Sequence, residues 1–294
     1  MEPILRAEKL TKRFGELTAN REIDIEIHAG EIHAIAGENG AGKSTLMSIL
    51  TGVLQPDAGE ICINGKPVMI RTPKDALQHG IGMIYQHFKL VKPFSVAENI
   101  VLGDDHVKVI NKKKLEARVK EVMREVGIPE EFYNRYPHQF SGGQRQRVGI
   151  ARALIMNPKL IIADECISAL DVSIQAQVVN LMKDIQAETQ CAYLFIAHDL
   201  SMVKYISDRI GVLHLGYMVE SGTKEEIFSH PVHPYTKSLL SAIPHPNPVV
   251  EKHRVALTYN YATSGIDYAK GTEHSVGGTH TVLATDEEFD AWTK

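Results

Sequence analysis

"GENGAGKST", residues Gly37 to Thr45, decides how the rest of the chain is interpreted. The stretch has the spacing G-x-x-x-x-G-K-S and lies between the apolar runs 32–36 and 46–50. A strand, a loop and a helix are therefore expected in this order. Glycines let successive backbone N–H groups turn inward on an anion, and the helix start adds partial positive charge. The stretch predicts a phosphate-binding loop.

The residues of this loop have distinct expected roles. Lys43 is expected to reach the terminal phosphates, and Ser44 to ligate Mg²⁺. The alternative is a glycine-rich turn that happens to precede a lysine, and the strand and helix on either side argue against it. The predicted nucleotide contacts in the loop are Gly37, Asn39, Gly40, Gly42, Lys43, Ser44 and Thr45.

The composition is that of an ordinary globular protein. The 294 residues are 44% hydrophobic and 23% charged, which allows one large domain or two modest ones. No apolar run approaches the roughly 20 residues that span a bilayer, and the N-terminus lacks the apolar core of a secretion signal. We expect a cytoplasmic chain. The net charge of −4 gives no reason to expect a nucleic-acid partner.

The three cysteines are Cys62, Cys166 and Cys191, which are widely spaced and form no C-x-x-C pair. A disulfide framework, a zinc site and an iron–sulfur cluster are therefore not expected. Cys62 and Cys191 are predicted to be small buried hydrophobic residues.

Periodicity outlines an α/β protein. "IDIEIH" alternates like a strand, and Asn64-Gly65 indicates a hairpin. Residues 111–126 predict an amphipathic helix, and from 159 onward apolar runs alternate with helical stretches, as in a sheet buried between helices. After Pro244 a proline-rich link leads into a tail of weak periodicity, which is expected to be peripheral. The apolar face of the predicted helix is Leu115, Val119, Val122, Met123 and Val126.

A second acidic site follows the strand in "KLIIADE", residues 159–165. Asp164 would organise Mg²⁺ through water, and Glu165 would polarise an attacking water molecule. The alternative is a strand that ends in two solvated acids. With both acids, ATP hydrolysis is expected, whereas the loop alone would equally suit a kinase or a nucleotide-binding protein without turnover.

In "FSGGQRQRVGIARAL", residues 140–154, Ser141, Gly142 and Gly143 open a helix whose apolar face is Val148, Ile150, Ala151 and Leu154. This helix start is a second anion cradle. One nucleotide has no use for two cradles in one chain, so the second indicates a dimer with two ATP molecules between protomers. Ser141 to Gln144 resembles the signature of ABC-type ATPases, and the other motifs of that family follow in order within residues 4–228.

The resemblance implies a P-loop ABC ATPase fold. Its parts would be a mixed-sheet nucleotide-binding core, an antiparallel β subdomain and an α-helical subdomain at about 88–155. The ATPase domain would cover residues 1–243, and residues 244–294 would be a C-terminal extension of the peptide-importer type.

Further site residues are implied by the same resemblance. Phe14 would stack on adenine, although a core phenylalanine is the alternative. Gln86 would touch Mg²⁺, together with Ser44 and Asp164, and sense the membrane partner. Asp171 would couple the two sites of the dimer, and His198 would contact the terminal phosphate unless it is structural.

One departure from the family pattern follows the acidic pair. Cys166-Ile167 stands where most members have Pro-Thr, and this departure bears on the local backbone geometry beside Glu165. Isoleucine is familiar there among peptide importers, and we expect hydrolysis to be retained. A nucleophilic role for Cys166 is not expected.

The resemblance favours a transporter subunit over a soluble translation or repair factor. There is a single ATPase unit without coiled-coil or zinc insertions, and residues 87–103 resemble the segment that receives a coupling helix of a membrane subunit. The implied partners are transmembrane permease subunits, a second identical or different ATPase protomer and, indirectly, an extracytoplasmic substrate-binding protein. The chain would lie peripherally on the cytoplasmic face of the plasma membrane.

The substrate indications differ between the two halves. Residues 1 to about 110 resemble nucleoside and sugar importer ATPases, whereas "HPVHPYTKSLLSAIPHPNP", residues 230–248, resembles oligopeptide and dipeptide importer ATPases. The His-Pro-Tyr segment is the narrower marker, so peptide import is favoured. The alternatives are a nucleoside or sugar importer and a nucleotide-gated assembly protein without turnover.

Overall fold

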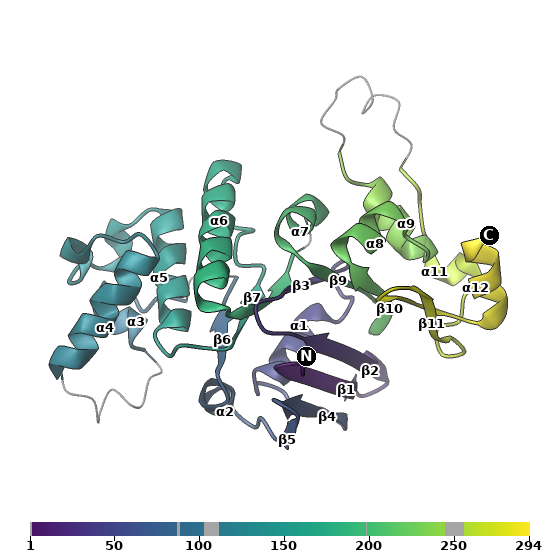
Figure 1. Cartoon of the computed structure of the whole chain (residues 1–294), viewed down its shortest axis with the longest axis horizontal. Helices are drawn as coiled ribbons and strands as arrows, with labels where there is room; N and C mark the ends of the chain where they lie inside the picture. The colour runs from purple at the N-terminus through teal and green to yellow at the C-terminus, as the bar shows by residue number, and fades with distance from the viewer. Residues whose placement is uncertain (1, 87–88, 103–111, 198, 245–255) are drawn as a thin grey trace.

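A large mixed sheet forms the centre of the computed structural model, which describes residues 2–86, 89–102, 112–197, 199–244 and 256–294 (Figure 1). Neighbouring strands from β9 to β6 run parallel, and β9, β10, β12 and β11 pair antiparallel. The predicted mixed α/β core is confirmed. In spatial order the strands are β11 (Thr272–Gly277), β12 (His280–Ala284), β10 (Tyr217–Thr223), β9 (Arg209–His214), β3 (Ile32–Ala36), β8 (Ala192–Ile196), β7 (Leu160–Asp164) and β6 (Ile81–Ile84).

Both faces of the central strands are buried. Alternate residues of a strand point to opposite faces, so Leu194 and Ile196 of β8 join one apolar cluster while Tyr193 and Phe195 join another. Strand β3 is buried along its whole length, and four of its five residues are apolar, with the buried His33 as the exception. The order of strands then brings the loops at the carboxyl ends of β3, β6 and β7 to one edge of the sheet.

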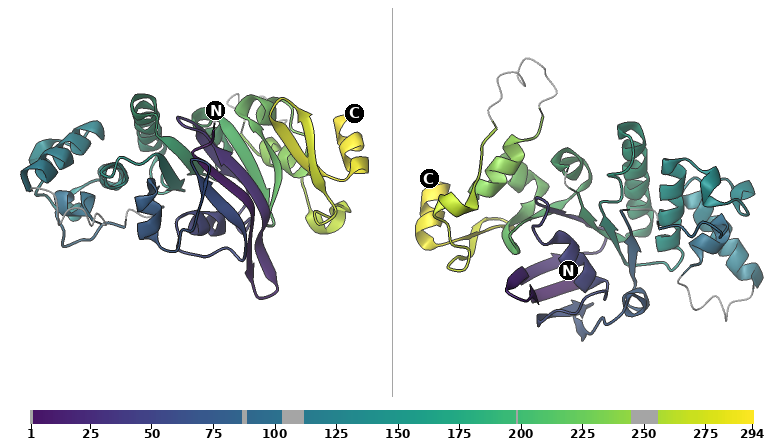
Figure 2. Two further views of the ribbon diagram at one scale, coloured as in Figure 1. Left: turned by 60° about the horizontal axis from the view of Figure 1, so that its bottom comes forward. Right: turned by 180° about the vertical axis from the view of Figure 1, so that it is seen from behind.

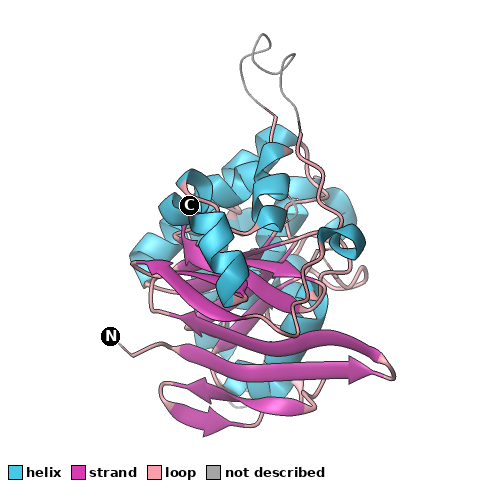
Figure 3. Ribbon diagram, turned by 90° about the vertical axis from the view of Figure 1, so that its right-hand side faces the viewer, coloured by secondary structure: helices cyan, strands magenta, loops and turns pink. Residues whose placement is uncertain are grey.

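A second sheet, antiparallel throughout, packs on one face of the large sheet. Figure 3 shows it below the larger sheet, with most helices on the opposite side. Asn64 and Gly65 both have positive φ, +48° and +70°, in the tight turn between its last two strands, as the Asn-Gly signal predicts. The order is β2 (Leu17–Ile27), β1 (Leu5–Phe14), β4 (Ala58–Ile63) and β5 (Lys66–Val68).

The predicted helical region lies at one end of the molecule, around α3 (Val96–Ile100), α4 (Lys112–Glu125) and α5 (Gly142–Leu154). In α4 and just after it, the predicted face is buried at Val119, Val122, Met123 and Val126 and partly buried at Leu115. The amphipathic pattern is therefore confirmed. Among the described residues, the remaining helices are α1 (Lys43–Leu50), α2 (Pro73–Gln78), α6 (Val172–Thr189), α7 (Leu200–Ile206), α8 (Lys224–Ser229), α9 (Pro234–Ser241), α11 (Tyr261–Ser264) and α12 (Asp286–Thr293), with short 3-10 turns η2 (Glu130–Phe132) and η3 (Pro137–Gln139).

The C-terminal tail is integrated into the sheet more fully than its weak periodicity predicted. Strand β12 pairs with β10 through Glu220–Val282 and Ser221–Thr281, and β11 follows as the outermost strand. Tyr268 is buried in the same apolar cluster as Tyr193 and Phe195 of β8. Figure 2 shows this hairpin and the helical region at opposite ends of the molecule. The domain boundary at residue 243 stays a prediction.

Two smaller expectations have different outcomes. Cys191 is buried as predicted, but the prediction for Cys62 is wrong because Cys62 lies on the half-exposed face of β4. Of the helices formed by the described residues, none combines the length and apolar character that a bilayer crossing requires.

Candidate functional site

The loop between β3 and α1 requires glycine at two positions. Gly37 and Gly42 have φ of +151° and +106°, in the left-handed half of conformational space. A Cβ on Gly37 would lie 2.2 Å from the Leu213 carbonyl oxygen, and one on Gly42 would lie 2.3 Å from that of Ala19. The loop backbone is therefore packed directly against other main chain.

Lys43 folds back over this loop. Its Nζ donates to the carbonyl oxygens of Gly37, at 2.7 Å, and Glu38, at 2.8 Å, and the residue is only 5% exposed. Burial lowers the pKa of Lys43, and the nearby carboxylates of Glu165, Asp164 and Glu38 oppose that shift. An ammonium group so placed can exchange its carbonyl partners for phosphate oxygens.

The two acids at the end of β7 lie beside Lys43. Burial, and then the charge of Glu165, raise the pKa of Asp164. Glu165 has φ of +42°, and its N–H donates to the Ile196 carbonyl at 3.1 Å. Gln86 follows β6, and its Nε2 donates to Glu165 Oε2 at 3.0 Å. The structure thus brings Gln86, Asp164, Glu165 and Lys43 together.

The unusual Cys166-Ile167 pair is accommodated in the core. Both side chains are buried, and Ser168 caps the turn by donating from its N–H and its hydroxyl to the Glu165 carbonyl, at 3.1 and 2.8 Å. Burial raises the pKa of Cys166 to about 12, so the thiol stays neutral. A thiolate nucleophile is thereby excluded at neutral pH.

The second predicted cradle opens α5. Ser141 Oγ accepts from the Gln144 N–H at 3.3 Å, and Gln144 Oε1 accepts from the Ser141 N–H at 3.0 Å, which forms a capping box. A Cβ on Gly143 would lie 2.6 Å from Ile174 Cγ2, so α5 approaches α6 closely here. The predicted apolar face of α5 (Val148, Ile150, Ala151 and Leu154) is buried.

Asp171 caps the neighbouring helix. Its Oδ1 accepts from the Ser173 hydroxyl at 2.8 Å and from the Ile174 N–H at 3.1 Å, and these bonds lower the pKa of Asp171. Since Ile174 also contacts the start of α5, Asp171 is placed beside the second cradle.

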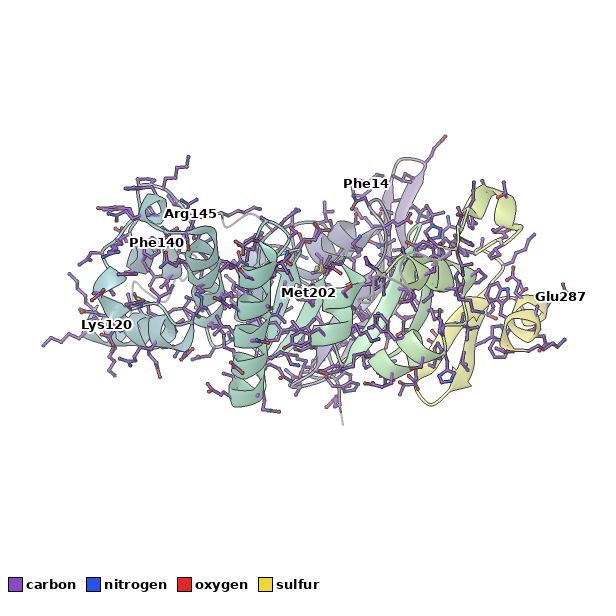
Figure 4. The ribbon with its side chains drawn as sticks, turned by 90° about the horizontal axis from the view of Figure 1, so that it is seen from above. Phe14, Lys120, Phe140, Arg145, Met202 and Glu287 are labelled. Carbon is purple, nitrogen blue, oxygen red and sulfur yellow. The ribbon has the colours of Figure 1, made fainter. Side chains whose placement is uncertain are left out.

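The two cradles are not brought together within the chain. In Figures 1 and 2 α5 lies on the far side of α6 from α1, and Figure 4 shows the same separation between Arg145 of α5 and Phe14. Phe14 ends β1 and is 46% exposed, so the alternative of a core phenylalanine is wrong. The ring is accessible to a planar ligand. His198 lies outside the described residues.

Arg152 is a site residue that the sequence did not reveal. From α5 it donates to the Asn99 carbonyl at 2.9 Å, to Asn99 Oδ1 at 3.2 Å and to the Lys89 carbonyl at 3.1 Å. Asn99 is buried and donates to the carbonyls of Val91, Phe94 and Ser95. The described part of the predicted docking segment, 89–102, is thus bonded to the signature helix. Residues 87, 88 and 103 lie outside the described residues.

Tyr235 is a second such residue. Its hydroxyl accepts from the Glu38 N–H at 3.0 Å, which joins α9 to the phosphate-binding loop. The sequence singled out the His-Pro-Tyr segment, but it did not indicate that Tyr235 contacts the phosphate-binding loop.

Comparison with known proteins gives a consistent family assignment. Residues 20–168 match the family model "ABC transporter", and residues 219–263 match "Oligopeptide/dipeptide transporter, C-terminal region". The chain is 46% identical to the oligopeptide transport ATP-binding protein OppF of Streptococcus mutans, over 96% of this chain and 93% of that protein. It is 44% identical to the dipeptide transport ATP-binding protein DppF of Lactococcus lactis, over 97% and 94%.

A solved structure with a similar fold is described as a dimeric ATP-binding cassette in a post-hydrolysis state, bound to ADP and Pi. It aligns with a TM-score of 0.65 at 28% identity, over 75% of this chain and 98% of that one. The two peptide-transport relatives cover both halves of the chain, so one family accounts for its whole length.

We expect Gly37→Ala to destabilise the nucleotide-free protein far more than Gly40→Ala. Both glycines have positive φ, but only Gly37 faces a carbonyl, whereas a Cβ on Gly40 meets nothing within 4 Å. The cost should be about 1 kcal/mol for Gly40→Ala and more than about 3 kcal/mol for Gly37→Ala. Urea unfolding measures both. Equal losses would show that the contact with Leu213 is unimportant.

Asp164→Asn should raise the melting temperature of the nucleotide-free protein at neutral pH. The folded-state pKa of Asp164 is raised, so its ionised form costs stability above that pKa. The difference between variant and parent should shrink as the pH falls through the raised pKa of Asp164, because the parent then becomes protonated. Asp171→Asn is the matched control with the opposite sign, since the pKa of Asp171 is lowered. A lower melting temperature for Asp164→Asn at pH 7 would contradict this account.

Proposed function

Since the chain belongs to the ABC transporter family, we propose that it is the ATP-hydrolysing subunit of an importer for oligopeptides or dipeptides. The observation that carries the proposal is the convergence of Lys43, Gln86, Asp164 and Glu165 on the glycine loop, with Gln86 bonded to Glu165 at 3.0 Å. Peptide is favoured as the substrate because residues 219–263 match the oligopeptide/dipeptide C-terminal region.

ATP binding follows from the loop and its surroundings. The N–H groups of the loop and of the start of α1 bind phosphate oxygens, and Lys43 turns from the carbonyls of Gly37 and Glu38 to the terminal phosphates. Phe14 offers its exposed ring to adenine. Asn39, Gly40 and Thr45 complete the predicted contacts.

The donor set also suits Mg²⁺. A hydroxyl from Ser44, an amide oxygen from Gln86 and the carboxylate of Asp164 are the hard oxygen ligands that this ion prefers. When bound, Mg²⁺ neutralises charge on the phosphates. The raised pKa of Asp164 fits a carboxylate whose ionised form a bound cation would stabilise further.

Hydrolysis depends on Glu165. Its carboxylate accepts a proton from water as the water attacks the terminal phosphorus in line, and Gln86 orients the carboxylate by donating to Oε2. Lys43 stabilises the charge that develops on the phosphoryl oxygens. His198 is the predicted additional contact to that phosphate.

The second cradle acts on the nucleotide of another protomer. Ser141 to Gln144 lie across α6 from the glycine loop, so they cannot reach the nucleotide held by their own chain. Two chains facing each other would close each nucleotide between one loop and the partner's α5, with Asp171 next to that contact. The partner is a second copy of this chain or a different ATPase subunit.

Closure of the dimer is coupled to transport through the segment 87–103. Arg152 bonds its described part to α5, so a movement of the signature helix is passed to the surface that would receive the permease. The protein would then act on the cytoplasmic face of the plasma membrane, with the extracytoplasmic substrate-binding protein as an indirect partner.

Glu165→Gln should lower ATP hydrolysis by about 10²-fold or more while ATP binding is retained, because the general base is lost. The ATP-bound variant should elute as a dimer in size-exclusion chromatography. Phosphate release, measured with the permease subunits present, gives the rate. Glu188→Gln, an exposed glutamate of α6, is the control and should keep the parent rate. Parent-like hydrolysis by Glu165→Gln would overturn the assignment of the base.

Deletion of the gene should abolish uptake of a labelled tripeptide by the native host and leave uptake of a labelled nucleoside intact. The parent gene should restore tripeptide uptake, and a Lys43→Ala copy should not. Loss of nucleoside uptake alone would replace peptide by nucleoside as the substrate. Loss of neither would refute the import function.

A further inference from the structure

Both backbone polar groups of Glu38, in the glycine loop, form hydrogen bonds. The Glu38 N–H donates to the Tyr235 hydroxyl at 3.0 Å, and the Glu38 carbonyl accepts from Lys43 Nζ at 2.8 Å. Tyr235 itself is buried, with 2% of its surface exposed. The position of the carbonyl that holds Lys43 therefore depends on a side chain from α9.

The ring of Tyr235 is itself fixed by its neighbours. His214, at the end of β9, stacks on it with ring centroids 3.9 Å apart, and Tyr259 packs edge-on at 5.6 Å. The His233 ring caps α9 by accepting the Tyr235 N–H at Nδ1, at 3.0 Å. Burial raises the pKa of Tyr235 to about 12, so its hydroxyl is neutral under physiological conditions.

A buried carboxylate ties this part of α9 to the C-terminal hairpin. Glu220 of β10 accepts from the N–H groups of Val232, at 2.7 Å, and His233, at 3.1 Å. The Nε2 atom of His280, on β12, lies 2.7 Å from Glu220 Oε1. A continuous set of short contacts thus runs from β12 through Glu220 and α9 to Glu38.

We propose that Tyr235 is a positioning residue for the nucleotide loop, through which the C-terminal region sets the affinity of the site for nucleotide. The inference rests on the proposed function, because it assumes that the loop binds ATP and ADP. Without the phenol, the Glu38 N–H loses its buried partner and the loop samples other conformations. Only a fraction of the molecules then presents the binding geometry, and the apparent affinity falls by that fraction.

The test uses Tyr235→Phe, which removes only the hydroxyl and keeps the stacked ring. Loss of one such hydrogen bond should raise the Kd for ADP with Mg²⁺ about 3- to 10-fold, measured by titration calorimetry on the full chain. Tyr259→Phe is the matched control. Its hydroxyl bonds Tyr268 at 3.0 Å in the same aromatic cluster without touching the loop, so its Kd should stay within about 2-fold of the parent.

A second readout reports on the loop without any nucleotide. Amide hydrogen exchange at Glu38 should accelerate about 5-fold or more in Tyr235→Phe and stay at the parent rate in Tyr259→Phe. An unchanged exchange rate in Tyr235→Phe, or equal losses of affinity in the two variants, would overturn the positioning role.

Lys43→Ala separates this inference from the function on which it rests. Its Kd for ADP should rise by more than about 10-fold. If Lys43→Ala weakens binding and Tyr235→Phe does not, the positioning role is wrong and the nucleotide site stands. If Lys43→Ala binds like the parent, the nucleotide site itself is wrongly assigned.

Discussion

Close approach of main chain to main chain is the constraint on which the nucleotide loop depends. The loop lies between the Leu213 carbonyl on one side and the Ala19 carbonyl on the other, and neither contact leaves space for a Cβ. Backbone bonds secure the same region, since the Gly216 N–H donates to the Ala41 carbonyl and the Arg21 N–H donates to that of Gly216. The antiparallel sheet and the β9–β10 turn are thus parts of the loop's support, and neither can move without moving the loop.

The two parts of the proposed nucleotide site lie apart within one chain. The glycine loop and the acids lie at the carboxyl edge of the parallel strands, whereas the signature helix lies beyond α6. In the proposed dimer, each chain would supply one half of each of two nucleotide sites. The Arg152 contacts to Asn99 and Lys89 give the signature half a direct link to the segment that faces the proposed membrane partner. In the proposed function, nucleotide closure and permease contact would be linked through Arg152.

The sequence predicted the parts of the site that are local. The spacing from Gly37 to Ser44, the acids at the end of β7 and the Ser141 cap of α5 are each local in sequence, so a short window contains the whole signal. The Tyr235–Glu38 contact joins residues 197 positions apart, and nothing near either residue indicates the other. The tail was missed for a related reason: β11 is exposed or half-exposed along its length, so its sequence has no strong alternation. The burial of Cys62 was mispredicted for the same reason, because the elements that pack on β4 decide which of its faces is buried.

The order of strands also determines when the site can exist during synthesis. Strand β3, which leads into the glycine loop, ends at residue 36, yet its two neighbours in the sheet are β8 and β9, which begin at residues 192 and 209. Such long-range pairings are slow to form and leave apolar strands without partners in the meantime. A ribosome must therefore release nearly three quarters of the 294-residue polypeptide before the loop has its support, and α9 emerges later still. A nucleotide loop supported as in the folded protein would consequently form only after translation has passed β9.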